Sequence, residues 1–150
     1  MEIAGQHQLP APPETVWRLL HDVDSLRNTV PGCKELEQTD TDAFAGSATV
    51  GIGVIKGLYK GTMRLVEQRE PSFARVEVQA RSGHAEIRGE GEVSLEPSDG
   101  GTLLRYKGDA RISGPLAAVG QRLLPSAAKS QTEAFFKNVE SALQSAGTQS

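Results

Sequence analysis

Three histidines are the side chains best suited to bind a metal or to move a proton. His7, His21 and His84 stand in separate parts of the sequence, without the spacing that metal-ligand sets need. The stretch His21-Asp22-Val23-Asp24 gathers three possible ligands, but it falls at the end of a predicted helix. A histidine there favours the negative helix end, and an aspartate caps the helix that follows. We therefore expect no metal and no cofactor.

The sequence offers equally little support for nucleophilic catalysis. Cys33 is the single cysteine, and no base that would activate its thiol can be named. The chain has no Gly-x-Ser-x-Gly elbow, and residues 57–62, GLYKGT, lack the Gly-Lys-Ser/Thr end of a phosphate loop. We expect no catalytic residue.

Composition narrows the classes of protein that remain. The chain has 150 residues, a net charge of −3 and 37% hydrophobic residues, which suits one globular domain. Nothing in this charge balance indicates nucleic-acid binding. The N-terminus lacks the features of a signal peptide, and no run of about 20 apolar residues could span a membrane. We expect a cytoplasmic protein, with at most peripheral contact at the inner face of a membrane.

The elements that would position any site follow from the apolar spacing. Residues 2–9 alternate as a strand, Pro13 begins a helix, and Asp24 is placed to cap a second helix over residues 25–30. From Cys33 the period becomes two, which predicts five or six antiparallel strands joined by short turns. A long helix then runs from residue 114 to about Leu143, kinked or split at Pro125. We expect one α+β domain over residues 1–143, with a bent antiparallel sheet wrapped around the C-terminal helix, and a flexible polar tail over residues 144–150.

The inner face of the predicted sheet carries many of the smallest residues. Glycine and alanine recur at positions such as Gly46, Gly61, Gly89 and Ala110. They allow the bends of a strongly curved sheet, with or without a space left between the sheet and the long helix. The residues alone leave two explanations of these small side chains open: curvature alone, and curvature together with a cavity. The expected lining of such a cavity is Val50, Tyr59, Met63, Val78, Ile87, Gly89, Tyr106, Gly108, Leu123 and Phe135.

Several segments resemble the family of the G subunit of carbon monoxide dehydrogenase. They are PAPPETVWRLLHDVDSLRNTVPGCKELE at 10–37, GLYKGTMRL at 57–65, GEGEVSLEP at 89–97, ISGPLAAVGQRLL at 112–124 and the Phe135-Phe136 pair. The resemblance covers about residues 2–143. It implies the helix-grip fold of the START-like (Bet v 1-like, polyketide cyclase/dehydrase) superfamily, which agrees with the element order above.

The same resemblance implies a function. Members are non-catalytic accessory proteins of molybdenum hydroxylases of the carbon monoxide dehydrogenase type. They are linked with binding a hydrophobic molecule such as a quinone or lipid, and with membrane recruitment of the enzyme. The alternatives are a small cyclase or hydratase that uses Tyr or Glu groups in the same cavity, and a pure protein-interaction module.

Overall fold

One antiparallel sheet and three helices make up the described part of the chain. The computed structural model describes residues 2–51 and 56–148, and side chains up to Ser145. The seven strands of the sheet lie in the order β1-β7-β6-β5-β4-β3-β2. The elements are β1 (Glu2–Leu9), α1 (Pro13–His21), α2 (Val23–Thr29), β2 (Cys33–Asp40), β3 (Ala43–Val50), β4 (Gly57–Arg69), β5 (Phe73–Arg81), β6 (Glu86–Ser98), β7 (Gly101–Ser113) and α3 (Ala117–Thr148). The predicted helix-grip order is confirmed, with six strands between the second and third helices.

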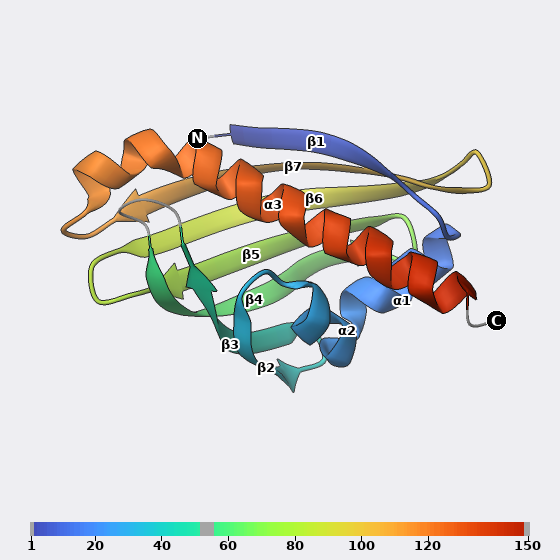
Figure 1. The fold of residues 1–150 in the computed structure, drawn as a ribbon, viewed down its shortest axis with the longest axis horizontal. Coiled ribbons are helices and arrows are strands. Elements are labelled where there is room, and N and C mark those ends of the chain that lie inside the picture. The colour runs from blue at the N-terminus through green and yellow to red at the C-terminus, as the bar shows by residue number, and fades with distance from the viewer. Residues whose placement is uncertain (1, 52–55, 149–150) are drawn as a thin grey trace.

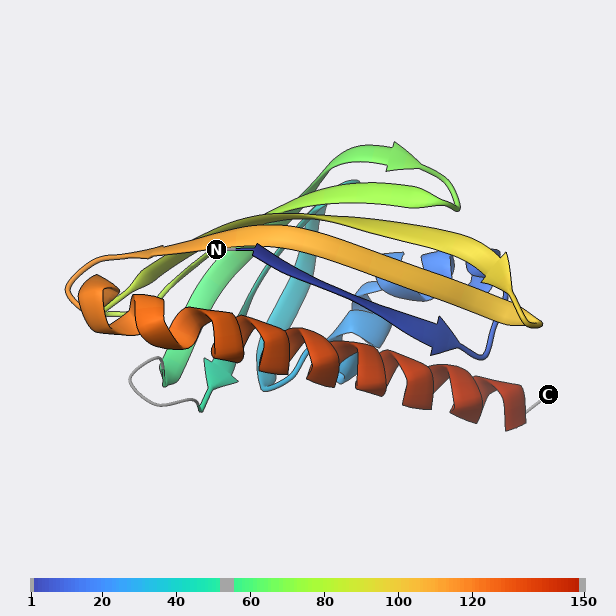
Figure 2. The same cartoon turned by 90° about the horizontal axis from the view of Figure 1, so that it is seen from above.

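The sheet curves around α3 without closing on itself. Figure 1 shows α3 crossing the sheet, and Figure 2 shows the strands arching over the helix. The helix packs on β1 and β7, and its C-terminal half also contacts α2. The edge strands β1 and β2 stay apart. The helix therefore covers the β1–β7 side of the inner face most closely.

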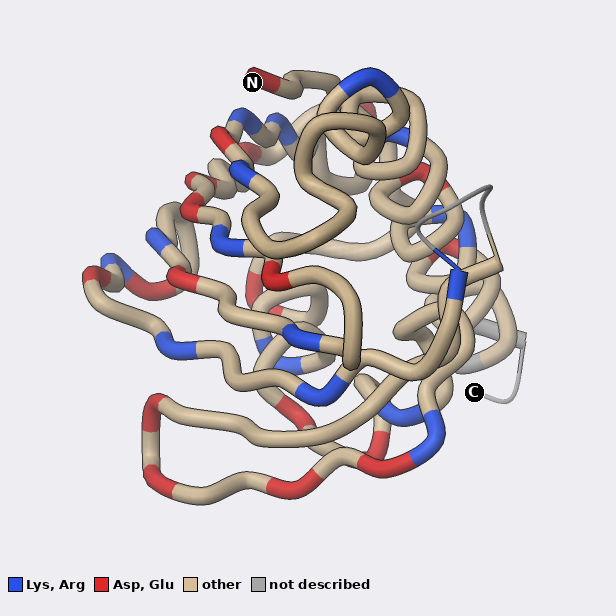
Figure 3. The backbone as a smooth tube through the Cα atoms, turned by 90° about the vertical axis from the view of Figure 1, so that its left-hand side faces the viewer, with Lys and Arg blue, Asp and Glu red and all other residues tan. Residues whose placement is uncertain are grey.

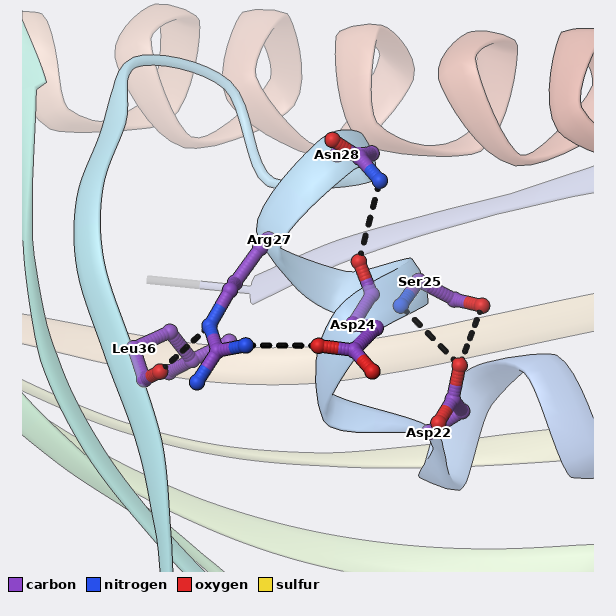
Figure 4. Close-up of polar contacts among 6 residues, drawn as sticks. All are labelled: Asp22, Asp24, Ser25, Arg27, Asn28 and Leu36. Carbon is purple, nitrogen blue, oxygen red and sulfur yellow. Dashed lines mark hydrogen bonds and ion pairs between the residues drawn. The ribbon is translucent and has the colours of Figure 1, made fainter.

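The two short helices share one capping residue. Pro13 opens α1 as predicted, and Asp22 both follows α1 and caps α2. The Asp22 carboxylate accepts hydrogen bonds from the backbone N–H and the hydroxyl of Ser25, at 3.1 and 2.7 Å (Figure 4). The prediction that Asp24 caps this helix was wrong, because α2 begins at Val23. Asp24 lies in its first turn and pairs with Arg27 instead.

Helix α3 differs from its prediction at both ends. It begins at Ala117, because Gly114 takes a φ of +102° and the Leu116 N–H donates to the His84 carbonyl. It continues to Thr148, beyond the expected end at Leu143. Pro125 lies within one uninterrupted helix, so the expected split does not occur. Its ring is exposed, and a proline removes a single helical hydrogen bond.

Two facing glycines show why the sheet needs small residues. Gly46 of β3 and Gly61 of β4 are direct register partners. A Cβ on Gly46 would collide with the backbone oxygen of Glu35, and one on Gly61 with that of Gln79. Neighbouring backbones thus approach too closely at this bend for any side chain. At Gly46 and Gly61 the missing side chain therefore serves the packing of adjacent strands.

The outer face of the sheet carries charges of both signs, interspersed along the strands (Figure 3). Arg75 lies 3.0 Å from Glu92, and Lys107 lies 3.4 Å from the same carboxylate on the other side. The hydrogen bond from Arg75 lowers the pKa of Glu92. Such exposed pairs add little stability, but their charges keep this face in contact with solvent. The apolar residues lie on the other face.

Candidate functional site

The apolar core beneath α3 is divided into two clusters. The large cluster packs the C-terminal half of α3 against α1, β6 and β7, with Trp17, Leu95, Leu104, Phe136 and Val139 among its buried members. The small cluster packs the N-terminal half of α3 against the far ends of the strands, and consists of Tyr59, Ala85, Ile112, Leu124 and Ala127. A single compact domain usually has one contiguous core. The strip of inner face between the two clusters is only partly packed: Phe44 is buried there, although it belongs to neither cluster, and Val78 is exposed.

A row of register partners crosses the sheet between the two clusters. We call it the middle row: Phe44, Met63, Val78, Gly89 and Ala110, on β3 to β7 in that order. Val78 stands on the central strand β5 and is 38% exposed. It lies on the same strand face as Ala74, which is buried in the large cluster, so its exposure is on the inner face. A central inner position this open is unusual for a packed sheet.

The predicted lining residues divide among these three regions. Met63, Val78 and Gly89 are consecutive members of the middle row, and Gly108 lies in the adjoining row opposite Gly91. Val50, Tyr59, Ile87 and Leu123 belong to or pack against the small cluster. Tyr106 and Phe135 belong to or pack against the large cluster. The eight strand residues thus share the inner face, Leu123 and Phe135 belong to α3, and the residues of the middle row lie between the two packed ends.

The two tyrosines have different hydrogen-bonding states. The Tyr106 hydroxyl donates to the Glu133 carboxylate of α3 at 3.0 Å. Burial, together with this bond and the negative charge of Glu133, raises the pKa of Tyr106 to about 12. The ring of Tyr59 is 5% exposed, and its hydroxyl has no hydrogen-bond partner among the described residues. Of the two, Tyr59 is the one whose hydroxyl stays available to a ligand.

Two titratable residues that the sequence interpretation did not select as site residues lie beside Tyr106. His7 Nε2 lies 2.9 Å from the other Glu133 oxygen, without the geometry of a hydrogen bond. The His7 ring packs on Phe136, with centroids 5.2 Å apart. The alternation of β1 could have revealed His7, because it shares the inner face with Ile3 and Leu9. These groups contact one another across the seam between α3 and the sheet, so they hold the helix in place.

His21, the first residue of the His-Asp-Val-Asp stretch, takes part in a different network. Its Nδ1 donates to the Trp17 carbonyl at 2.8 Å, and its Nε2 lies 2.7 Å from Gln68 Oε1. The Gln68 amide in turn donates to Asp42 at 2.7 Å. This chain of contacts joins α1 to β4 and to the β2–β3 turn. Within residues 2–51 and 56–148, no group of three His, Cys, Asp or Glu side chains is placed to hold a metal ion.

A hollow of about 780 Å³ lies on the outer face of the sheet, opposite α3. Its walls carry outward residues of β2 to β6, among them Glu35, Lys60, Thr62, Gln79 and Arg81. Lys60 and Arg81 are direct register partners, and neither makes an ion pair within the described part of the chain. A mixed, charged lining of this kind suits a polar partner surface better than an apolar small molecule.

The fold places the chain in the helix-grip class, in which a curved antiparallel sheet holds a long C-terminal helix. Solved structures agree with this assignment. A conserved protein from Geobacillus kaustophilus is 29% identical, with a TM-score of 0.89 and coverage of 97% of this chain and 96% of that one. A START superfamily protein from Mycobacterium smegmatis is 13% identical, with a TM-score of 0.75 and coverage of 96% and 97%. The second likeness shows the fold alone.

The family model for the G subunit of carbon monoxide dehydrogenase (CoxG) matches residues 5–144, and the chain belongs to that family. The resemblance seen in the sequence is thereby confirmed. No curated protein matches the chain. The family assignment supports a ligand-binding accessory role in general terms.

None of the helices among the described residues is long and apolar enough to cross a membrane.

Proposed function

We propose that the chain is a non-catalytic accessory protein of a molybdenum hydroxylase of the carbon monoxide dehydrogenase type. It binds a quinone or lipid-like molecule between the sheet and α3, and it assists recruitment of the enzyme to the membrane. In this role the protein acts in the cytoplasm and contacts the membrane only peripherally. The family assignment supports the link with the enzyme.

The observation that carries the ligand-binding part is the interrupted core. The middle row lies between two packed clusters, and Val78 at its centre is 38% exposed on the inner face. An apolar molecule laid against Met63 and Val78 would remove their exposed surface from water. Such burial contributes about 25 cal/mol for each Å² of apolar surface covered.

The same geometry argues against catalysis at this place. General acid–base chemistry needs a titratable group that faces the substrate. The described side chains of the middle row are apolar, the Tyr106 and Glu133 groups nearby are bonded to each other, and the available Tyr59 hydroxyl belongs to the small cluster. A raised pKa of about 12 also keeps Tyr106 protonated at neutral pH.

Calorimetric titration with decylubiquinone and with monoolein tests the proposal. We expect at least one of the two to bind with a stoichiometry of one per chain. Failure of both to bind at concentrations up to their solubility would contradict the ligand-binding proposal. Co-expression with the catalytic subunits of a carbon monoxide dehydrogenase-type hydroxylase, followed by gel filtration, tests the partner separately.

A second candidate function is a pure protein-interaction module. The outer hollow favours it, because Lys60 and Arg81 stand there side by side without ion pairs among the described residues. In that case the double substitution of Lys60 and Arg81 by Glu would abolish association with the hydroxylase, and no apolar molecule would bind. Retained association in this variant would contradict the interaction module.

A further inference from the structure

A chain of polar groups ties the end of helix α1 to the sheet. It runs from the Trp17 carbonyl of α1 through the His21 ring and the Gln68 amide of β4 to the Asp42 carboxylate of the β2–β3 turn. The successive contacts measure 2.8, 2.7 and 2.7 Å. The groups at the two ends, a backbone carbonyl and a carboxylate, can only accept hydrogen bonds. The protons that join them must therefore come from His21 and Gln68.

This chain lacks one proton if His21 is neutral. The Gln68 amide donates to Asp42 and presents its oxygen to His21 Nε2, while the Trp17 carbonyl faces Nδ1. Both ring nitrogens thus face an acceptor, and a neutral imidazole has a single N–H. Turning the Gln68 amide around would place its oxygen against the Asp42 carboxylate and leave that contact without a proton. Because histidine is the side chain that ordinarily changes its charge between pH 5 and 8, the extra proton belongs on His21.

Two further features favour a positive charge on the His21 ring. The ring stacks on that of Trp17, with centroids 4.4 Å apart and planes inclined by 27°. A cation over the face of a tryptophan is attracted by the electrons of the ring. His21 is also the last residue of α1, where the helix dipole is negative. Both effects stabilise the imidazolium more than the neutral ring.

The charged groups around His21 are compatible with this assignment. The charged side chains close to it on α1, on β4 and in the β2–β3 turn are all exposed: Arg18, Asp22, Asp40, Asp42, Glu67 and Arg69. Asp22 accepts from Ser25, and Glu67 lies 3.4 Å from Arg69. Asp42 is the carboxylate that the chain connects to His21, so it balances the imidazolium charge across one amide.

We propose that His21 is a protonation-dependent tie: its imidazolium holds the α1–α2 segment, residues 13–29, against the sheet, and loss of the extra proton loosens that segment. Without this proton one ring nitrogen turns a lone pair toward an acceptor, and the hydrogen bond is lost. The stabilisation is therefore present at low pH and is lost as the pH rises through the range in which His21 gives up its proton. This inference goes beyond the proposed function and does not depend on it.

The position of α2 gives the tie a consequence for the rest of the fold. Helix α2 contacts both β2 and α3, and Asn138 of α3 donates to the Thr29 carbonyl of α2 at 3.0 Å. A looser α1–α2 segment therefore uncovers the inner face of the sheet on its β2 side.

Nuclear magnetic resonance of the histidine rings tests the protonation of His21. The ¹⁵N-labelled chain is titrated from about pH 5 to about pH 9, and the His21→Gln and His84→Gln variants assign the signals. His84 is the internal comparison, because it is exposed and its ring has no partner in the described part of the chain. We expect both His21 nitrogens to carry protons at the pH where His84 has lost its extra proton. A His21 ring that loses its proton together with His84, or before it, would overturn the inference.

A matched pair of variants tests the part played by Gln68. Gln68→Leu removes the acceptor at Nε2, so a neutral ring that donates to the Trp17 carbonyl then satisfies every contact. In this variant His21 should lose its proton at a lower pH than in the unaltered chain. Gln79→Leu makes the same change at an exposed position of β5 and should leave the titration as it is. The same His21 titration in both variants would overturn the inference.

Hydrogen exchange of the unaltered chain tests the loosening. The protection of amides in residues 13–29 is divided by that of amides in β5, β6 and β7 of the same sample, which cancels the effect of pH on the exchange chemistry. We expect this ratio to fall by about 3- to 10-fold as His21 loses its proton, the effect of one hydrogen bond. A ratio that stays constant while His21 titrates would overturn the inference.

Discussion

The Tyr106 hydroxyl donates a 3.0 Å hydrogen bond to the Glu133 carboxylate, and this bond ties strand β7 to helix α3. The Tyr106 ring reaches this position across Gly5 of β1, where a Cβ would overlap its hydroxyl end. The bond therefore depends on a glycine in one strand, a tyrosine in the next and a glutamate on the helix. It fixes one side of the helix, while the middle row on the other side stays partly uncovered.

The Tyr106 pKa predicts an alkaline loss of stability. Because the folded pKa is raised from 10.0 to about 12, the folded chain holds this proton more tightly than the unfolded chain. The stabilisation is present in full below pH 10 and is lost as the pH rises to 12. One pKa unit is worth about 1.4 kcal/mol, so the loss by pH 11, one unit above the unfolded pKa, is at most about 1.4 kcal/mol. Urea unfolding at pH 8 and pH 11 measures it.

The matched variant for that experiment is Tyr106→Phe. It keeps the ring and removes the hydroxyl, and it should cost about 1 kcal/mol at pH 8 through the lost bond to Glu133. Its stability should fall less between pH 8 and pH 11 than that of the unaltered chain. An equal fall in both proteins would show that Tyr106 is not the responsible group.

The close approach at Gly61 predicts a large effect of one methyl group. Gly61→Ala places a Cβ against the Gln79 backbone oxygen, which cannot move without disturbing the sheet, and should destabilise the chain by roughly 1–3 kcal/mol. Gly83→Ala is the control, because a Cβ at Gly83 meets nothing within 4 Å. Thermal unfolding compares the two. Similar melting temperatures for both variants would argue against the crowding at Gly61.

The cap of α2 distinguishes two neighbouring aspartates. Asp22→Ala removes the acceptor for the Ser25 N–H and should cost about 1 kcal/mol. Asp24→Ala removes an exposed ion pair with Arg27 and should cost less than about 0.5 kcal/mol. Chemical denaturation of the two variants gives the order directly. A greater loss from Asp24→Ala would contradict the observed cap.

Filling the middle row should block the ligand without unfolding the protein. Met63→Trp adds volume next to Val78 and should reduce decylubiquinone binding by more than about 10-fold, with a circular dichroism spectrum like that of the unaltered chain. Val66→Trp makes a similar change at an exposed position of the same strand and should leave binding intact. Undiminished binding to Met63→Trp would place the ligand elsewhere.

The architecture could be predicted because local signals agreed with one another. Pro13 began a helix where a missing N–H costs nothing, and alternation from Phe44 to Ile112 gave strands whose inner and outer faces were assigned correctly. The cap was misplaced because Asp22 ends one helix and starts the next, so that either aspartate satisfied the pattern.

The polar contacts under α3 could not be predicted in the same way. His7, Tyr106 and Glu133 come from the first strand, the last strand and the C-terminal helix, and only the fold brings them together. Tyr59 and Tyr106 occupy similar positions in their strand patterns. Only the structure distinguishes the bonded hydroxyl from the one without a partner among the described residues.

Mass spectrometry of the purified chain tests the central claim most directly, with the intact protein measured under native conditions beside an organic extract of the same sample. We predict an apolar molecule in the extract and a matching mass increase of one molecule per chain. An empty extract, a native mass equal to that of the polypeptide alone and no binding of added decylubiquinone would contradict the claim.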